Sequence, residues 1–213
     1  MGIRQKSWLA SGLIYVLFVF WYTDFGGPLS DQEIDAWVET MQENGSTPER
    51  IAYYEAFLRN DSGRQFLMLN VLDKNENPPD VPGAEPGENS DQLMARYMEH
   101  IVSEFLVLAS HPVYLGDAVY QALDISGIEG FEGAEEWDQG ALVRYRSRRS
   151  FMQIISNPEI KGKHVFKLAA LEKTIAYPTE ASFYPGDLRL LVGLILLTLT
   201  ALLDALVLPR KTG

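Results

Sequence analysis

The stretch "FLMLNVLDKN" at residues 66–75 decides the fold of this chain. Its Leu, Met and Val residues predict a β-strand that is covered on both faces, because such strands are nearly continuous apolar runs. Asn70 lies in the middle of the run. A buried amide needs hydrogen-bond partners, so Asn70 either binds a polar ligand in a cavity or pairs with backbone or water. The sequence leaves both alternatives open.

The surrounding segments predict a β-α-β-β-α-β order. This order is the ferredoxin-like, split βαβ plan of an α+β fold, in which helices cover one face of a four-stranded antiparallel sheet. We expect strands at 66–75, 112–123, 137–147 and 174–181, and helices at 90–111 and 147–173, the latter broken near Asn157-Pro158.

Both faces of the first strand are apolar. Leu67, Leu69 and Val71 alternate with Phe66, Met68 and Leu72. Because helices cover only one face of this fold, the other face needs a second cover. We therefore expect a homodimer.

A helical hairpin is predicted before the first strand, at 30–45 and 47–61. Ser30 and Glu33 form a capping box, and Thr47 followed by Pro48 marks a second helix start. The segments 74–91 and 124–136 are rich in Gly and acidic residues, the first also in Pro, and predict loops.

Two uncharged apolar runs, 8–22 and 190–203, lie near the ends of the chain. A spanning helix needs about 20 mostly apolar residues, so we expect a transmembrane helix at each end. The alternatives are a signal peptide for the first run and a buried core helix for the second. The sequence "WYTDFGG" after the first run lacks small residues at the spacing of a cleavage site, which favours an uncleaved anchor.

Basic residues flank both runs at their terminal sides. Arg4 and Lys6 precede the first, and Arg210 and Lys211 follow the second. The positive-inside rule then predicts cytoplasmic termini and an extracytoplasmic central domain, periplasmic if the source is bacterial. Asp204, in the second run, is either hydrated at the interface, paired with Arg4 or Lys6, or in contact with a partner subunit.

The chain thus divides into an N-terminal anchor (1–25), a helical hairpin (26–63), a ferredoxin-like domain (64–186) and a C-terminal anchor with a basic tail (187–213). Between residues 26 and 186 there are 26 acidic and 13 basic residues. Such a charge excludes electrostatic binding of nucleic acid.

Three stretches resemble a domain-of-unknown-function branch of the dimeric α+β-barrel superfamily. They are "FLMLNVL", "YMEHIVSEFLVLASHPVYLGD" and "EEWDQGALVRYRSRRSFMQIISNPEIKGKHVFKLAALEKT". The resemblance covers roughly residues 64–178 and implies a ferredoxin-like fold and barrel-forming homodimers. Sister branches include small monooxygenases and isomerases, so the resemblance implies no particular reaction. The two anchors distinguish this chain from typical members.

Five residues are candidates for ligand binding: Asn70, Tyr97, His100, Arg144 and His164. Tyr97 lies on the apolar stripe of helix 90–111, beside His100. His164 shares a helical face with Ile160, Leu168 and Leu171, and the resemblance adds a His after "NPE". Each candidate also has a structural alternative: packing for Tyr97, a surface ion pair for His100, a pair with a nearby acid for Arg144, and a hydrogen-bonded core role for His164.

The absence of Cys and the separation of the three His predict neither a metal site nor a cofactor. Three functions compete. The first is a membrane-anchored, non-catalytic small-molecule-binding or accessory subunit of a larger membrane complex. The second is a cofactor-independent, monooxygenase- or isomerase-like enzyme for small aromatic or quinone-like compounds, since a histidine with Asn and Arg in a dry cavity would suit proton transfer. The third is a purely structural homodimer. The strong anchoring signal and the weak catalytic signal favour the first.

Overall fold

The computed structural model describes residues 1–128 and 130–207, except for the side chains of His100 and Val207. The chain forms two compact units. One contains Gly26–Glu180, and the other joins Met1–Phe25 to the chain from Ala181 onward. The predicted hairpin (26–63) therefore belongs to the same unit as the sheet.

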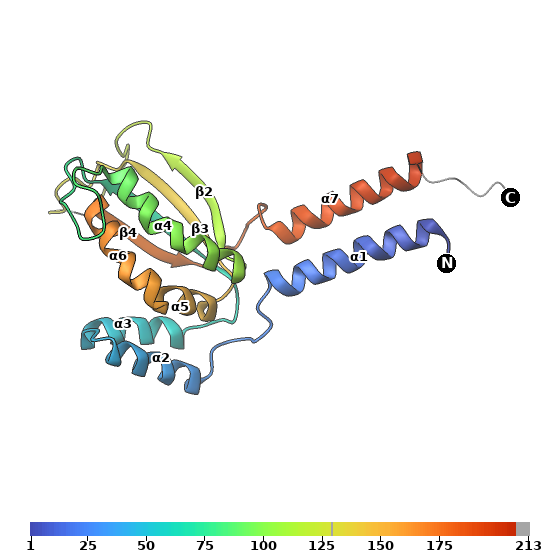
Figure 1. Ribbon diagram of the computed structural model, residues 1–213, viewed down its shortest axis with the longest axis horizontal. Helices are drawn as coiled ribbons and strands as arrows, with labels where there is room; N and C mark the ends of the chain where they lie inside the picture. Colours follow the sequence, from blue (N-terminus) through green and yellow to red (C-terminus); the bar gives the residue numbers. More distant parts are fainter. Residues whose placement is uncertain (129, 208–213) are drawn as a thin grey trace. The chain divides into compact units, whose positions relative to one another are not determined.

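The Gly26–Glu180 unit has the predicted ferredoxin-like topology (Figure 1). Its four-stranded sheet is antiparallel, with the order β2-β3-β1-β4. The two central strands are therefore β1 and β3, and the α+β expectation is confirmed. The elements are α2 (Asp31–Glu43), α3 (Pro48–Arg59), β1 (Phe66–Lys74), α4 (Ser90–Val107), β2 (His111–Asp117), β3 (Gln139–Tyr145), α5 (Arg148–Ser156), α6 (Pro158–Ala170) and β4 (Leu171–Thr179).

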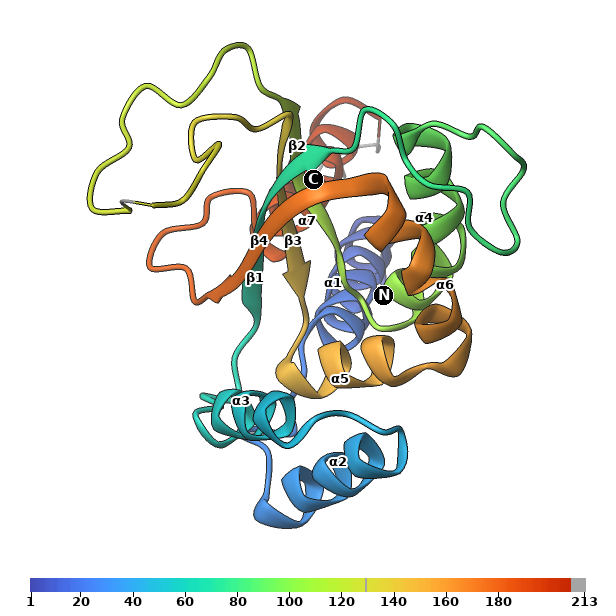
Figure 2. The same ribbon diagram turned by 90° about the vertical axis from the view of Figure 1, so that its left-hand side faces the viewer.

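Helices α4, α5 and α6 lie on one side of the sheet (Figure 2). Phe66 faces them, and its ring stacks on Tyr145 at 5.2 Å between centroids and meets Phe151 edge-on at 5.7 Å. Both Phe66 and Met152 are almost completely buried. This aromatic cluster forms the main core, and it extends to Ile34 and Leu58 of the helical hairpin.

The other face of the sheet carries a second apolar set. The strand register places Leu69 of β1 beside Leu142 of β3 and Tyr177 of β4. Ile175 and Tyr177 are 44% and 47% exposed. The two-residue period of a strand puts these side chains opposite the helices, as the sequence predicts.

Two features hold the hairpin in place: a contact with α5 and a close approach of the two chain segments that flank the hairpin. The guanidinium of Arg148 donates to the backbone carbonyl of Phe57 and lies 3.5 Å from the carboxylate of Asp61. Gly63 has a φ of +72°, and a Cβ there would lie 2.6 Å from the backbone of Gly27. Only glycine fits this close approach.

Three element boundaries differ from the prediction. Helix α4 ends at Val107 instead of 111, because Ala109 adopts a left-handed conformation (φ 47°). Strand β2 ends at Asp117 instead of 123, because Asp117 pairs with Gln139, the first residue of β3. Helix α6 ends at Ala170, so Leu171 begins β4 and does not share a helical face with His164.

The local start and stop signals are confirmed. Ser30 and Glu33 cap α2 reciprocally, and the Thr47 side chain caps α3 with Pro48 at its first position. Asn157 ends α5 and caps α6, which places the predicted break. Strand β2 begins at His111, one residue before the predicted start.

The other unit is an antiparallel pair of helices, α1 (Ile3–Tyr22) and α7 (Leu188–Leu202), with α7 continuing as a π-helical turn at Leu203–Val207 (Figure 1). By length and composition, one segment of the described chain, Leu188–Leu206, could cross a membrane, with a mean hydropathy of 2.0. Helix α1 does not meet this criterion, and its first turns contain Arg4 and Lys6. Within the described residues, a candidate span is therefore present at the C-terminal end only.

Polar contacts join α1 to α7 along their length. Arg4 Nε lies 3.0 Å from a carboxylate oxygen of Asp204, and Arg4 Nη2 donates to the Asp204 carbonyl at 2.7 Å. The first contact is an ion pair without hydrogen-bond geometry, since both of its atoms lack a hydrogen-bond partner. The Ser11 and Thr200 hydroxyls are 2.6 Å apart. Of the alternatives for Asp204, the structure supports pairing with Arg4.

The Ser11–Thr200 contact gives a direct test of the helix pair. Because the chain has no cysteine, we expect Ser11→Cys with Thr200→Cys to form a disulfide under mild oxidation, visible as a mobility shift that reductant reverses. Leu9 is 60% exposed, so Leu9→Cys with Thr200→Cys is the matched control and should not cross-link. Equal cross-linking of both pairs would contradict the antiparallel register.

Candidate ligand-binding cavity

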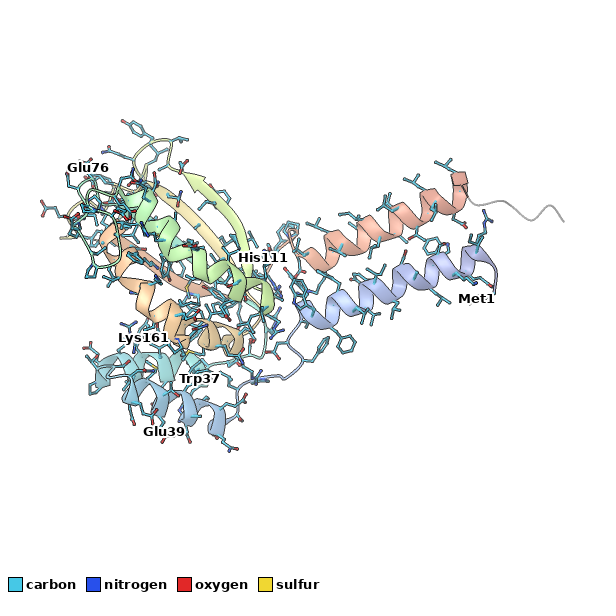
Figure 3. All side chains as sticks on the ribbon, in the orientation of Figure 1. Met1, Trp37, Glu39, Glu76, His111 and Lys161 are labelled. Carbon is cyan, nitrogen blue, oxygen red and sulfur yellow. The ribbon has the colours of Figure 1, made fainter. Side chains whose placement is uncertain are left out.

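A cavity of about 680 Å³ lies inside the Gly26–Glu180 unit. Its walls come from the helix-covered face of the sheet, from α4, α5 and α6, and from the α2–α3 hairpin. Lys161 lies where α6 meets the hairpin (Figure 3), and its Nζ donates to the carbonyl of Asn44 at 3.3 Å. The hairpin therefore closes one side of the cavity.

Three of the five sequence candidates line this cavity together: Asn70, Tyr97 and His164. Asn70 lies on the helix-covered face of β1, Tyr97 on α4 and His164 on α6. The rings of Tyr97 and His164 meet edge-on, with centroids 6.1 Å apart. Residues far apart in sequence thus converge on one site.

One of the two polar side-chain atoms of Asn70 is hydrogen-bonded within its own strand. Its Nδ2 donates to the Met68 carbonyl at 3.0 Å, which is the pairing that the structural alternative requires. Among the described residues, its Oδ1 has no partner. The oxygen is therefore available to accept a hydrogen bond from a molecule in the cavity.

Arg144 does not reach the cavity. Its register partner in β1 is Leu67, so it lies on the sheet face opposite Asn70. The side chain is completely buried, where it donates to Gln65 Oε1 at 2.7 Å and to the Ala109 carbonyl at 2.6 Å. The ligand role predicted for Arg144 is therefore replaced by a structural one, which holds the turn between α4 and β2.

His100 lies on α4, but its side chain is outside the part of the chain that the structure describes. Trp137 stacks on Phe131 and donates its indole N–H to the Ala134 carbonyl at 2.8 Å. Within the described ranges, no group of His, Asp or Glu side chains could hold a metal ion.

The sequence analysis missed Lys167. It lines the cavity one turn beyond His164, and its Nζ lies 5.8 Å from the centroid of the Tyr97 ring. Burial lowers the pKa of Lys167. The signal was present in the sequence, because residues 160, 164 and 167 share one helical face.

The electrostatic environment of the cavity is positive. Burial lowers the pKa of His164, and the charges of Lys167 and Arg50 lower it further. Burial also raises the pKa of the Tyr97 phenol. His164 is therefore biased toward its neutral form and Tyr97 toward its protonated form.

A second cavity of about 490 Å³ lies beside the first. Tyr54, Met68, Phe151 and Ala176 line both cavities, so they form the partition between them. The charged groups of the second cavity, Arg148 and Glu180, pair with each other at 3.3 Å. The two charged groups of the second cavity are thus paired, whereas the basic groups of the first have no carboxylate partner among the described residues.

Comparisons with known proteins bear on the fold alone. No family model matches this chain, and no curated protein matches it. Two crystal structures of RPA0582, a protein of unknown function from Rhodopseudomonas palustris, are similar to it. The methylated form has 21% identity and a TM-score of 0.52 over 66% of this chain and 95% of its own. The other form has 22% identity and a TM-score of 0.49 over 65% and 95%.

A dimeric protein of unknown function and ferredoxin-like fold from Bacteroides fragilis NCTC 9343 aligns with 10% identity and a TM-score of 0.32. The alignment covers 55% of this chain and 96% of that protein. Only the similarity to the methylated RPA0582 protein exceeds a TM-score of 0.5 among these three structures, and it supports the ferredoxin-like fold that the strand order shows.

The lowered pKa of His164 predicts a pH dependence of stability. Because the folded state binds this proton less readily than the unfolded state, whose His has an ordinary pKa of 6.5, protonation favours unfolding. The stabilisation is fully present above pH 6.5 and is lost as the pH falls below it. Urea unfolding between pH 7.5 and 5 should show a smaller pH dependence in His164→Gln than in the wild type.

His111→Gln is the control for this experiment, since His111 starts an edge strand outside the cavity. If His111→Gln reduced the pH dependence and His164→Gln left it unchanged, the assignment to His164 would be wrong.

Proposed function

We propose that this chain is a membrane-anchored, non-catalytic small-molecule-binding protein that acts as an accessory subunit of a membrane complex. One observation carries the proposal: the cavity brings Asn70, Tyr97 and His164 together while leaving Asn70 Oδ1 and both His164 ring nitrogens without partners among the described residues. Its volume of about 680 Å³ lies within the range of small-molecule sites.

The same observation supports binding over catalysis. A general base is normally oriented by a second group that accepts a hydrogen bond from it. Within the described chain, no carboxylate or carbonyl holds the ring of His164. The alternative is the cofactor-independent enzyme for small aromatic or quinone-like compounds, in which a bound substrate itself would have to orient His164.

Binding can be tested with the neutral fluorescent probe 2-naphthol and the full chain in nanodiscs. We expect saturable binding that Asn70→Ala and His164→Ala each weaken about tenfold, which corresponds to one lost hydrogen bond of roughly 1–1.5 kcal/mol. The control Asn77→Ala alters an exposed loop side chain and should leave binding unchanged. Lower melting temperatures of the two cavity variants with unchanged affinity would instead assign both residues to structure.

We propose that both α1 and α7 cross the membrane, with both termini cytoplasmic and the Gly26–Glu180 unit outside, periplasmic if the source is bacterial. The support comes from the candidate span Leu188–Leu206 and from the polar contacts that pair α1 with it. If α7 spans the membrane with α1 beside it, the contact between the two helices shields Ser11 and Thr200 from lipid. Arg210 and Lys211, on which the orientation also depends, lie outside the described residues.

The topology can be tested with alkaline phosphatase, which is active only outside the cytoplasm. Fusion after Gly213 should be inactive, and insertion in the exposed segment at residues 118–122 should be active. The reverse pattern would overturn the proposed orientation.

We further propose that a second copy covers the open sheet face, which carries Leu69, Val71, Ile175 and Tyr177. Particle mass in detergent should correspond to two chains. Val71→Asp should give single chains, because a carboxylate would lose its hydration in an apolar interface. Val119→Asp changes a fully exposed side chain and should remain dimeric. A wild-type particle of one chain would refute the homodimer.

A further inference from the structure

We infer that the cavity binds an organic anion, with one carboxylate or comparable group placed against Lys167 and an apolar body placed among the methionine and aromatic side chains. This inference rests on the proposed binding function and adds the chemical class of the ligand. It follows from the charge, the burial and the shape of the cavity walls.

The charges that line the cavity have one sign. Its ionisable groups, apart from the tyrosines, are Arg50, Lys161, His164 and Lys167, and neither Asp nor Glu lines its described walls. This is unusual in a segment with 26 acidic and 13 basic residues. A positive cavity in an acidic domain selects anions over cations.

The cavity cations also lack counter-ions. Among the described residues of the same unit, at least six basic side chains pair with carboxylates: Arg59, Lys74, Arg96, Arg148, Arg149 and Lys173. Among the described residues, Arg50, Lys161 and Lys167 make no such pair. Acidic partners are abundant in this unit, yet none reaches the cavity.

Lys167 is the most confined of these cations. It is partly buried, and its only contact of an ionic kind in the described chain is the face of the Tyr97 ring. Burying an ammonium without a counter-ion is costly. An anion placed against Lys167 would remove this cost and would gain binding energy by doing so. The lowered pKa of Lys167 has the same origin.

The uncharged side chains of the cavity indicate the shape and polarity of the rest of the ligand. Met41, Met68 and Met152 line the cavity with Phe151 and Ile155. Methionine side chains adapt to irregular apolar ligands. A small inorganic anion would leave these surfaces and most of the 680 Å³ unfilled. Asn70 Oδ1 adds an acceptor for a hydroxyl or amide N–H of the ligand.

The inference can be tested with three probes of one shape: 2-naphthoate, neutral 2-naphthamide and cationic 2-naphthylmethylammonium. Isothermal titration uses the full chain in zwitterionic nanodiscs, with empty nanodiscs as the reference for lipid partitioning. We expect 2-naphthoate to bind at least about tenfold more tightly than 2-naphthamide, the gain typical of a charge-assisted contact. The cation should bind more weakly than either.

Lys167→Gln should abolish the preference for 2-naphthoate while retaining 2-naphthamide binding. Lys163→Gln is the matched control. It removes the same charge from the same helix, and Lys163 also lies over an aromatic ring, that of Phe166 at 5.3 Å, but it does not line the cavity. This control should keep the preference, and thermal melts should confirm that both variants fold.

Each other outcome is decisive. Equal affinities for the anion and the amide, or a preference that survives Lys167→Gln, would overturn the anion inference while leaving a binding function in place. Tighter binding of 2-naphthylmethylammonium than of 2-naphthoate would also overturn the anion inference and leave a binding function in place. Failure of all three probes to bind saturably would overturn both the inference and the proposed function.

Discussion

The contact between Arg148 and Asp61 is the constraint on which the cavity depends. Both side chains are nearly buried, and Arg148 also pairs with Glu180 at the end of β4 and lies over the Phe57 ring. Asp61 in turn accepts from the Leu29 amide at 2.9 Å. Breaking a buried ion pair costs about 3–5 kcal/mol. This network seats the hairpin on the sheet, and the hairpin supplies Arg50 and Tyr54 to the cavity.

Charged residues have two different roles in the Gly26–Glu180 unit, one at its surface and one in its cavity. Surface carboxylates make the Gly26–Glu180 unit acidic, which favours solubility. Ion pairs such as Arg149–Glu33, at 2.6 Å, use basic residues to hold α5 to α2. The guanidinium and the Ser30 groups hold the pKa of Glu33 near 2. Among the described residues, the cavity cations have no carboxylate partners, and this difference is the basis of the proposed binding site.

The pair of helices α1 and α7 depends on different interactions. In the membrane location proposed for this pair, helices gain little from hydrophobic contact, so close packing and polar contacts would hold them together, at roughly 0.6 kcal/mol per polar contact. Gly193 lets the Tyr15 ring approach, since a Cβ there would lie 3.2 Å from it. The Ser11–Thr200 and Arg4–Asp204 contacts fix which faces meet. Their role is to set the register of the pair more than its stability.

The order of strands and helices along the chain, the helix starts and the helical break at Pro158 could all be predicted from the sequence, because capping and two-residue alternation are local. Alternation also assigned Asn70 and Leu67 to opposite faces. The site itself depends on the tertiary structure. The fold places Arg144 on the sheet face opposite Asn70 and places Lys167 in the cavity wall, because the partner of a side chain depends on strand register and helix packing. No local pattern encodes which residues are neighbours in space. The contact of Tyr97 with His164 and the absence of carboxylates from the described cavity walls are two examples.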